Sequence, residues 1–230
     1  MLILALDSTA VAASVALTED DRPLAAFKLE NGHTHSRTLL PMVKAILDVT
    51  GHTVDDVDLF ACSIGPGSFT GVRIGAATVK GLAFGKNKNV LGISTLEALA
   101  ENLMPYNGLI CPVMNARRDQ VYTALFCGES GVLTRLTPDA ALSVEELEQM
   151  LTGRGEPFCL VGDGTKPVRG ALKTLTPRPT PALLTAENAV SVARLAYRAA
   201  KAGAAGTDAD LKPLYLRMPQ AERERLKKQQ

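Results

Sequence analysis

An apolar run at residues 59–64 ends in Gly65-Pro66-Gly67, and a stretch rich in small residues follows at 70–85. This pattern predicts a buried strand, a glycine turn and a buried helix. Such a turn can place backbone N–H groups and the N-terminus of a helix around an anion. It is equally the form of an ordinary tight connection between a strand and a helix, because such turns favour glycine. The turn is therefore either a phosphate-binding loop or a packing device, and both interpretations stay open.

The composition is that of an ordinary globular protein, with 46% apolar and 21% charged residues among 230. Lys plus Arg number 25 and Asp plus Glu 24, so the net charge does not indicate nucleic acid as a partner. No apolar run approaches the about 20 residues that span a membrane, and residues 1–7 lack the basic start of a signal peptide. The four cysteines form no C-x-x-C pair, which is typical of a reducing compartment. We therefore expect a cytoplasmic protein without membrane contact.

The first half of the chain predicts three strands followed by alternating helices and strands. The three strands are short apolar runs separated by polar turns, which indicates an antiparallel meander. The first helix follows from apolar residues at helical spacing, and Pro41 within it is tolerated if Thr38 is the N-cap. The predicted elements are strands 2–6, 13–17 and 24–29, a helix from Thr38 to about Val49, strand 58–64, helix 70–85, strand 90–94 and a helix from Thr95 to about Met104.

The second half repeats the order of the first. Leu109–Asn115 follows the pattern of Met1–Asp7, and Phe158–Gly164 follows that of Phe60–Gly67. This half predicts strands at 109–115, 121–126, 132–136 and 158–162, an alanine-rich helix at 186–202 and an extended segment at 211–216.

Two β-β-β-α-β-α halves predict the fold class. They indicate an α/β fold built from two ribonuclease-H-like lobes, with mixed sheets flanked by helices, as in the actin, hexokinase and Hsp70-like superfamily. We expect the first lobe at 1–105 and a second, degenerate lobe at 106–210. The tail at about 211–230 is expected to return to the first lobe.

Asp7 and two glycine turns are the candidate cofactor-binding groups. In a phosphotransferase of this superfamily, an aspartate at the end of the first strand positions a metal-bound phosphate, and glycine turns from both lobes hold the nucleotide. Corresponding places here are occupied by Asp7, Gly65, Gly67, Gly162 and Gly164. A small nucleotide-dependent kinase or ATPase is therefore the alternative function, although any strand-to-helix turn also favours glycine.

The histidines do not form a recognisable metal site. His33 and His35 are two residues apart, whereas ligands on one helix face need a spacing of three or four, and His52 stands alone. The sequence contains neither an H-E-x-x-H motif nor a G-x-S-x-G nucleophile elbow. We therefore predict no catalytic residue, no metal site and no cofactor.

The predicted helix at 70–85 is apolar on nearly every side, with Arg73 and Lys80 as its only charges. A helix that is apolar all round must be covered all round, and a sheet covers only one side. The remaining cover is either the helix from Thr38 of the same chain or another subunit. For the second case, the expected interface residues are Leu39, Val43, Ile46, Val72, Ile74, Ala76, Val79 and Phe84.

Motifs along the whole chain match one family pattern: Leu4-Ala-Leu-Asp-Ser-Thr9, His35-Ser-Arg-Thr-Leu-Leu-Pro-Met-Val43, Gly65-Pro-Gly-Ser-Phe-Thr-Gly-Val-Arg-Ile-Gly75, Gly92-Ile-Ser-Thr-Leu96, Ala116-Arg117 with Val121-Tyr122, Leu214-Tyr-Leu-Arg217 and Ala221-Glu-Arg223. The chain thus resembles the TsaB family, also called YeaZ. The resemblance implies a role in making threonylcarbamoyladenosine in tRNAs that read codons beginning with A. It implies a non-catalytic partner of the larger relative TsaD, with the ATPase TsaE completing the complex and tRNA reached through the complex. Pairing is implied through the helices that start near Thr38 and Thr70, with TsaD or, without it, with a second copy as a homodimer.

The C-terminal tail is mildly basic. Its basic residues outnumber Glu222 and Glu224, which predicts either a solvated terminus or a segment that meets an RNA backbone. The basic residues are Lys212, Arg217, Arg223, Arg225, Lys227 and Lys228.

Overall fold

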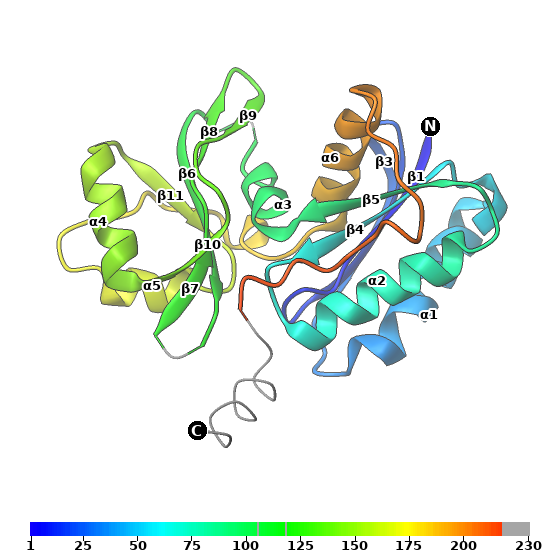
Figure 1. The fold of residues 1–230 in the computed structure, drawn as a ribbon, viewed down its shortest axis with the longest axis horizontal. Helices are drawn as coiled ribbons and strands as arrows, with labels where there is room; N and C mark the ends of the chain where they lie inside the picture. The colour runs from blue at the N-terminus through cyan, green and yellow to red at the C-terminus, as the bar shows by residue number, and fades with distance from the viewer. Residues whose placement is uncertain (105, 118, 218–230) are drawn as a thin grey trace.

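The computed structural model describes residues 1–104, 106–117 and 119–217, which form two lobes side by side (Figure 1). The basic tail residues Arg223, Arg225, Lys227 and Lys228 lie outside the described residues. Within the described ranges, no helix is long and apolar enough to cross a membrane.

The first lobe is built on a five-stranded sheet in the order β3-β2-β1-β4-β5. β1, β2 and β3 are antiparallel neighbours, whereas β4 runs parallel to β1 and β5 parallel to β4. β1 and β4 lie at the centre and are buried on both faces, which is why their sequences are continuous apolar runs. The strands are β1 Leu2–Asp7, β2 Ala13–Glu19, β3 Arg22–Leu29, β4 Leu59–Gly65 and β5 Asn89–Ser94.

Helices cover both faces of this sheet. α1 (His35–Thr50) and α2 (Phe69–Ala83) pack against each other and against one face, where Leu4 and Leu6 of β1 point. The alternate residues of β1 point to the other face, which α6 (Ala189–Lys201) covers. The sheet and its helices therefore enclose two apolar layers.

α1 begins earlier than the sequence predicts. Its N-cap is Thr34, not Thr38, and Pro41 lies inside the helix on an exposed face. The prediction was wrong because residues 35–37 are polar or only partly buried, so they add nothing to the apolar periodicity from which the helix was inferred. α2 begins close to its predicted start, with the Ser68 hydroxyl accepting a hydrogen bond from the Gly71 N–H.

The second lobe repeats this plan around β6, which pairs with antiparallel strands on one side and with parallel β11 on the other. The strand predicted at 121–126 is divided into β7 and β8, which pair with opposite ends of β6. β10, α4 and α5 were not predicted. The elements are β6 Gly108–Asn115, β7 Gln120–Thr123, β8 Phe126–Glu129, β9 Val132–Arg135, β10 Ala140–Ser143, α4 Val144–Arg154, β11 Phe158–Val161 and α5 Thr165–Ala171.

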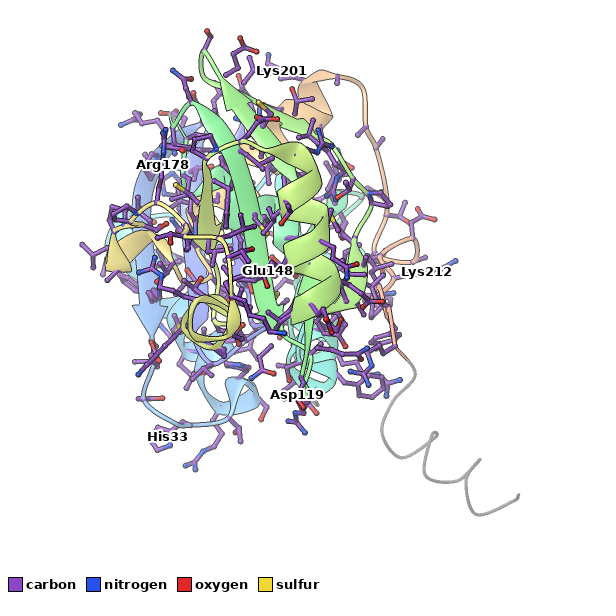
Figure 2. All side chains as sticks on the ribbon, turned by 90° about the vertical axis from the view of Figure 1, so that its left-hand side faces the viewer. His33, Asp119, Glu148, Arg178, Lys201 and Lys212 are labelled. Carbon is purple, nitrogen blue, oxygen red and sulfur yellow. The ribbon has the colours of Figure 1, made fainter. Side chains whose placement is uncertain are left out.

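Helices also cover both faces of the second sheet. α4, seen in front of the sheet in Figure 2, packs with α5 on the outer face. α3 (Thr95–Glu101) packs on the inner face and also contacts α6, so it lies between the two lobes. These features confirm the predicted fold class, an α/β fold of duplicated lobes with mixed sheets flanked by helices.

α6 belongs to the packing of the first lobe, although it falls within the range 106–210 expected for the second. Its small residues Ala189, Ala193 and Ala196 fit closely against the first sheet. Asn102 fixes the segment through which the chain returns from the second lobe to α6. Its side-chain amide donates to the carbonyl oxygens of Leu184 and Ala186 at 3.0 and 2.9 Å.

Candidate functional site

Asp7, the predicted phosphate-positioning residue, is buried and engaged within the first lobe. Its Oδ1 accepts hydrogen bonds from the N–H and the hydroxyl of Thr9 at 2.9 and 2.7 Å. Its Oδ2 accepts one from the Ser63 hydroxyl at 2.5 Å. Burial raises the pKa of the Asp7 carboxyl, and these hydrogen bonds act against that rise. Asp7 therefore ties the end of β1 to β4.

The glycines around the start of α2 allow close backbone packing. A Cβ atom on Gly67 would lie 2.5 Å from the carbonyl oxygen of Thr9, and one on Gly71 would lie 2.0 Å from that of Ser8. The Ser68 N–H donates to the same Thr9 oxygen at 2.7 Å. The turn after β1 and the start of α2 are thus in direct contact, and this contact alone accounts for the two glycines.

The remaining candidate glycines also face backbone atoms. Gly65, at a φ of +114°, would place a Cβ 2.5 Å from the carbonyl oxygen of Leu214. Gly162, at a φ of +111°, and Gly164 would place theirs 2.3 and 2.9 Å from the carbonyl oxygen of Val113. Packing therefore explains both predicted turns without a nucleotide.

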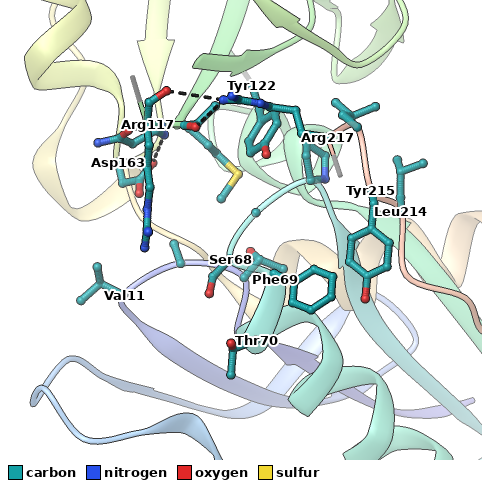
Figure 3. Close-up of a pocket in the computed structure, with 18 residues that line it drawn as sticks. Val11, Ser68, Phe69, Thr70, Arg117, Tyr122, Asp163, Leu214, Tyr215 and Arg217 are labelled. Carbon is teal, nitrogen blue, oxygen red and sulfur yellow. Dashed lines mark hydrogen bonds between the residues drawn. The ribbon is translucent and has the colours of Figure 1, made fainter. Parts of the chain in front are cut away.

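A cavity of about 600 Å³ lies between the lobes (Figure 3). The turn after β1 and the start of α2 form its first-lobe wall, and the end of β6 forms its second-lobe wall. A segment near the C-terminus completes it. The lining residues include Thr9 to Val11, Pro66 to Thr70, Met114 to Arg117, Tyr122, Asp163 and Leu214 to Arg217.

The C-terminal segment 211–217 joins the two lobes at this cavity. Leu211 is buried in the core of the first lobe, and the Leu214 N–H donates to the carbonyl oxygen of Ile64 at 2.7 Å. At its end, Nη1 of Arg217 donates to the carbonyl oxygen of Ala116 in the second lobe at 2.7 Å. The segment runs across the front of the first lobe to the space between the lobes (Figure 1).

Tyr215 fastens the same segment to α2. Its hydroxyl accepts a hydrogen bond from Nε of Arg73 at 2.9 Å, and its ring centroid lies 4.8 Å from that of Phe69. The Arg73 guanidinium also lies 4.0 Å above the Phe69 ring, a favourable cation–π distance. Two aromatic rings and one guanidinium thus meet at the edge of the cavity.

Two carboxyl groups with raised pKa values were not predicted: Asp163, which lines the cavity, and Glu187, which is buried. Partial desolvation by the surrounding chain raises the pKa of the Asp163 carboxyl, although the residue as a whole is exposed, and its Oδ1 accepts a hydrogen bond from the Asn115 N–H at 2.9 Å. Burial, with a smaller contribution from Asp7, raises the pKa of Glu187 to about 8. Within the described ranges, Oε1 of Glu187 has no hydrogen-bond partner. No sequence pattern marks Glu187, because its burial depends on how the chain crosses between the lobes.

The predicted partner-interface residues are mostly internal, which corrects that prediction. Ile74 is partly buried, and only Phe84, at 77% exposure, lies openly on the surface. The reason is that α1 and α2 cover each other and the sheet, so the apolar surface of α2 is largely buried within its own chain. The buried members are Leu39, Val43, Ile46, Val72, Ala76 and Val79.

A different set of residues forms the exposed face of α1 and α2. Leu40 and Val49 of α1 are 54% and 69% exposed, and Phe84 follows directly after α2. Ala77 and Gly81 lie on the exposed side of α2, and nothing lies within 4 Å of where a Cβ of Gly81 would be. Leu40 and Val49 lie nine residues apart and so point to different sides of α1, whereas Ala77, Gly81 and Phe84 share one side of α2. We call the exposed surface of the two helices that carries these five residues the α1–α2 face.

His33 and His35 have different surroundings in the structure. Nε2 of His35 is 2.8 Å from the carbonyl oxygen of Ala10, and His33 lies on an exposed loop (Figure 2). In the part of the chain that the structure describes, no group of three or more His, Cys, Asp or Glu side chains could hold a metal ion.

Comparisons with known proteins agree with the fold. The family model described as TsaD, tRNA N6-adenosine threonylcarbamoyltransferase, matches residues 30–222, so the chain lies within this wider family. The solved structure of YeaZ from Pseudomonas aeruginosa superposes with a TM-score of 0.78 at 30% identity, covering 94% of this chain and 99% of that one.

Sequence relatives narrow the assignment. The Bacillus subtilis (strain 168) tRNA threonylcarbamoyladenosine biosynthesis protein TsaB is 33% identical over 165 residues, 72% of each chain. The Escherichia coli (strain K12) TsaB is 35% identical over 167 residues, 71% of this chain and 72% of the relative. The chain belongs to the TsaB (YeaZ) family.

Proposed function

We propose that this chain takes part in threonylcarbamoyladenosine biosynthesis as the non-catalytic subunit of the complex that transfers the threonylcarbamoyl group to tRNA. The acceptor is the adenosine beside the anticodon in tRNAs that read codons beginning with A, and the protein works in the cytoplasm. The observation that carries the proposal is the identity of 33–35% to two proteins named for this biosynthesis.

The internal contacts of the predicted nucleotide-binding groups support a non-catalytic role. The oxygens of Asp7 are used by Thr9 and Ser63. The glycine turns are filled by backbone atoms of the chain itself. The alternative of a nucleotide-dependent kinase or ATPase therefore loses the residues on which it was based.

The proposed partner is TsaD, bound through the α1–α2 face, with the ATPase TsaE joining the pair and a homodimer forming through the same face when TsaD is absent. Three large apolar side chains of these two helices are more than half exposed, and a partner that packs on the helices would remove them from water. Gly81 supports a helix as the partner element. Glycine costs about 1 kcal/mol inside a helix, and here no neighbour in the chain requires it, so it leaves room for a second backbone to approach.

Reconstituted transfer tests the proposed function. Purified TsaD and TsaE are supplied with threonylcarbamoyl adenylate and unmodified tRNA, with and without this chain. We expect transfer to rise at least about tenfold when the chain is added, and we expect none from the chain alone. Transfer by the chain alone, or transfer that does not depend on it, would contradict the proposal.

A further inference from the structure

An arginine with no described partner faces the cavity between the lobes. Figure 3 shows the Arg117 side chain extending from the second lobe toward Val11 and the start of α2. Arg117 is exposed, and no hydrogen bond or ion pair of its guanidinium occurs within the described part of the chain. A guanidinium prefers planar oxygen acceptors, phosphate and carboxylate above all.

The opposite wall offers groups of matching chemistry. The N–H groups of Phe69 and Thr70 are the first two of α2, so they have no acceptor within the helix. The exposed hydroxyls of Ser68 and Thr70 lie beside them at the positive end of the helix dipole. An anion between these groups and Arg117 would be bound from both lobes.

Arg217 positions the turn that carries Arg117. Its Nη1 lies 2.7 Å from the carbonyl oxygen of Ala116 and 3.5 Å from that of Arg117 itself. This brace supports Arg117 in a left-handed conformation, with a φ of +62°. Among the described lining residues, Asp163 is the one acid, and its carboxylate is engaged by the Asn115 N–H.

We propose that this cavity binds a backbone phosphate of RNA, with Arg117 and the start of α2 as the phosphate ligands. The proposal rests on the proposed function, which makes tRNA available as the polyanion. Phe69, Tyr215 and Tyr122 line the same cavity, and aromatic side chains beside arginines suit unpaired bases. This aromatic lining favours RNA over a small free anion.

Binding of a labelled tRNA anticodon stem-loop to the isolated full chain tests the proposal, by fluorescence anisotropy over a range of salt concentrations. Arg117→Asn removes the guanidinium but keeps a residue that tolerates the left-handed conformation. We expect it to weaken binding about tenfold and to lower the slope of log K against log salt by about 0.7–0.9. Arg154→Gln, an exposed arginine on α4, is the matched control and should leave both values unchanged.

Thr70→Glu provides a second variant that cannot be explained by unfolding. A glutamate in the first turn favours the helix, but its charge repels a phosphate. We expect unchanged thermal stability and RNA binding weakened about tenfold. Equal losses in Arg117→Asn and Arg154→Gln would overturn the proposal, as would the absence of RNA binding. Displacement of the RNA by millimolar inorganic phosphate or adenosine monophosphate would assign the cavity to a small anion and likewise overturn it. Because TsaD is absent from this assay, its failure leaves the proposed pairing with TsaD unaffected.

Discussion

At the residue scale, the two buried carboxyl groups of Asp7 and Glu187 differ in the hydrogen bonds that they accept. Asp7 and Glu187 are both almost fully buried, but only Asp7 has three hydrogen bonds to its carboxylate. Glu187 retains a carboxylate oxygen without a partner in the described ranges, and its pKa is raised to about 8. The folded protein therefore holds Glu187 protonated near neutral pH, whereas the unfolded chain releases that proton above its ordinary pKa of 4.5.

This difference predicts a pH-dependent stability. Between about pH 4.5 and 8 the folded state binds more protons than the unfolded state, so the Glu187 contribution to the free energy of unfolding falls as pH rises. Glu187→Gln removes the titrating group, so the variant should gain stability relative to the wild type between pH 5 and 8. Urea unfolding of the wild type and the variant at pH 5 and at pH 8 measures the gain. If the free energy of unfolding changed with pH by the same amount in both proteins, Glu187 would not titrate in this range.

The candidate site was predicted only where it depends on local sequence. The glycine turns and the start of α2 follow from neighbouring residues, and the structure has them close to where they were expected. Arg117, Tyr215 and Arg217 reach the cavity only because segments far apart in the chain meet there. No local pattern contains that information.

At the element scale, the errors have separate physical causes. The start of α1 was misplaced because its first turn carries no apolar pattern, and the strand at 121–126 was not divided because both halves keep strand-like residues. α4 was missed although Ser143 and Glu146 form a capping box and Gly155 ends the helix at a φ of +64°. These residues are a recognisable signal for a helix with a weak apolar face.

One side of α2 is tightly packed and the other is open. Replacing one glycine on each side by alanine distinguishes the two sides. Gly71→Ala would place a Cβ 2.0 Å from the Ser8 carbonyl oxygen, whereas Gly81→Ala meets nothing within 4 Å. We expect the first to lower the free energy of unfolding by about 1–3 kcal/mol and the second to raise it by up to about 1 kcal/mol. Urea denaturation of both variants checks this, each serving as the control for the other. Equal effects would mean that the contact between α2 and Ser8 is not as the structure has it.

At the scale of the whole molecule, the internal duplication was predictable because the order of strands repeats. The arrangement of the two lobes was not, because α6 returns to the first sheet and 211–217 bridges both lobes. The same long-range packing explains the incorrect interface prediction. Apolar periodicity shows that α1 and α2 must be covered, but it does not show that they cover each other.

The central claim is that the α1–α2 face binds TsaD, and light scattering on mixtures with TsaD tests it most directly. We predict a complex with the mass of one copy of each chain. Leu40→Asp with Phe84→Asp should weaken it at least about tenfold, because the complex would bury two unpaired charges. Leu183→Asp, at a residue that is 92% exposed and outside this face, should pair like the wild type. Separate masses for the wild-type mixture, or undiminished pairing by the double variant, would contradict the claim.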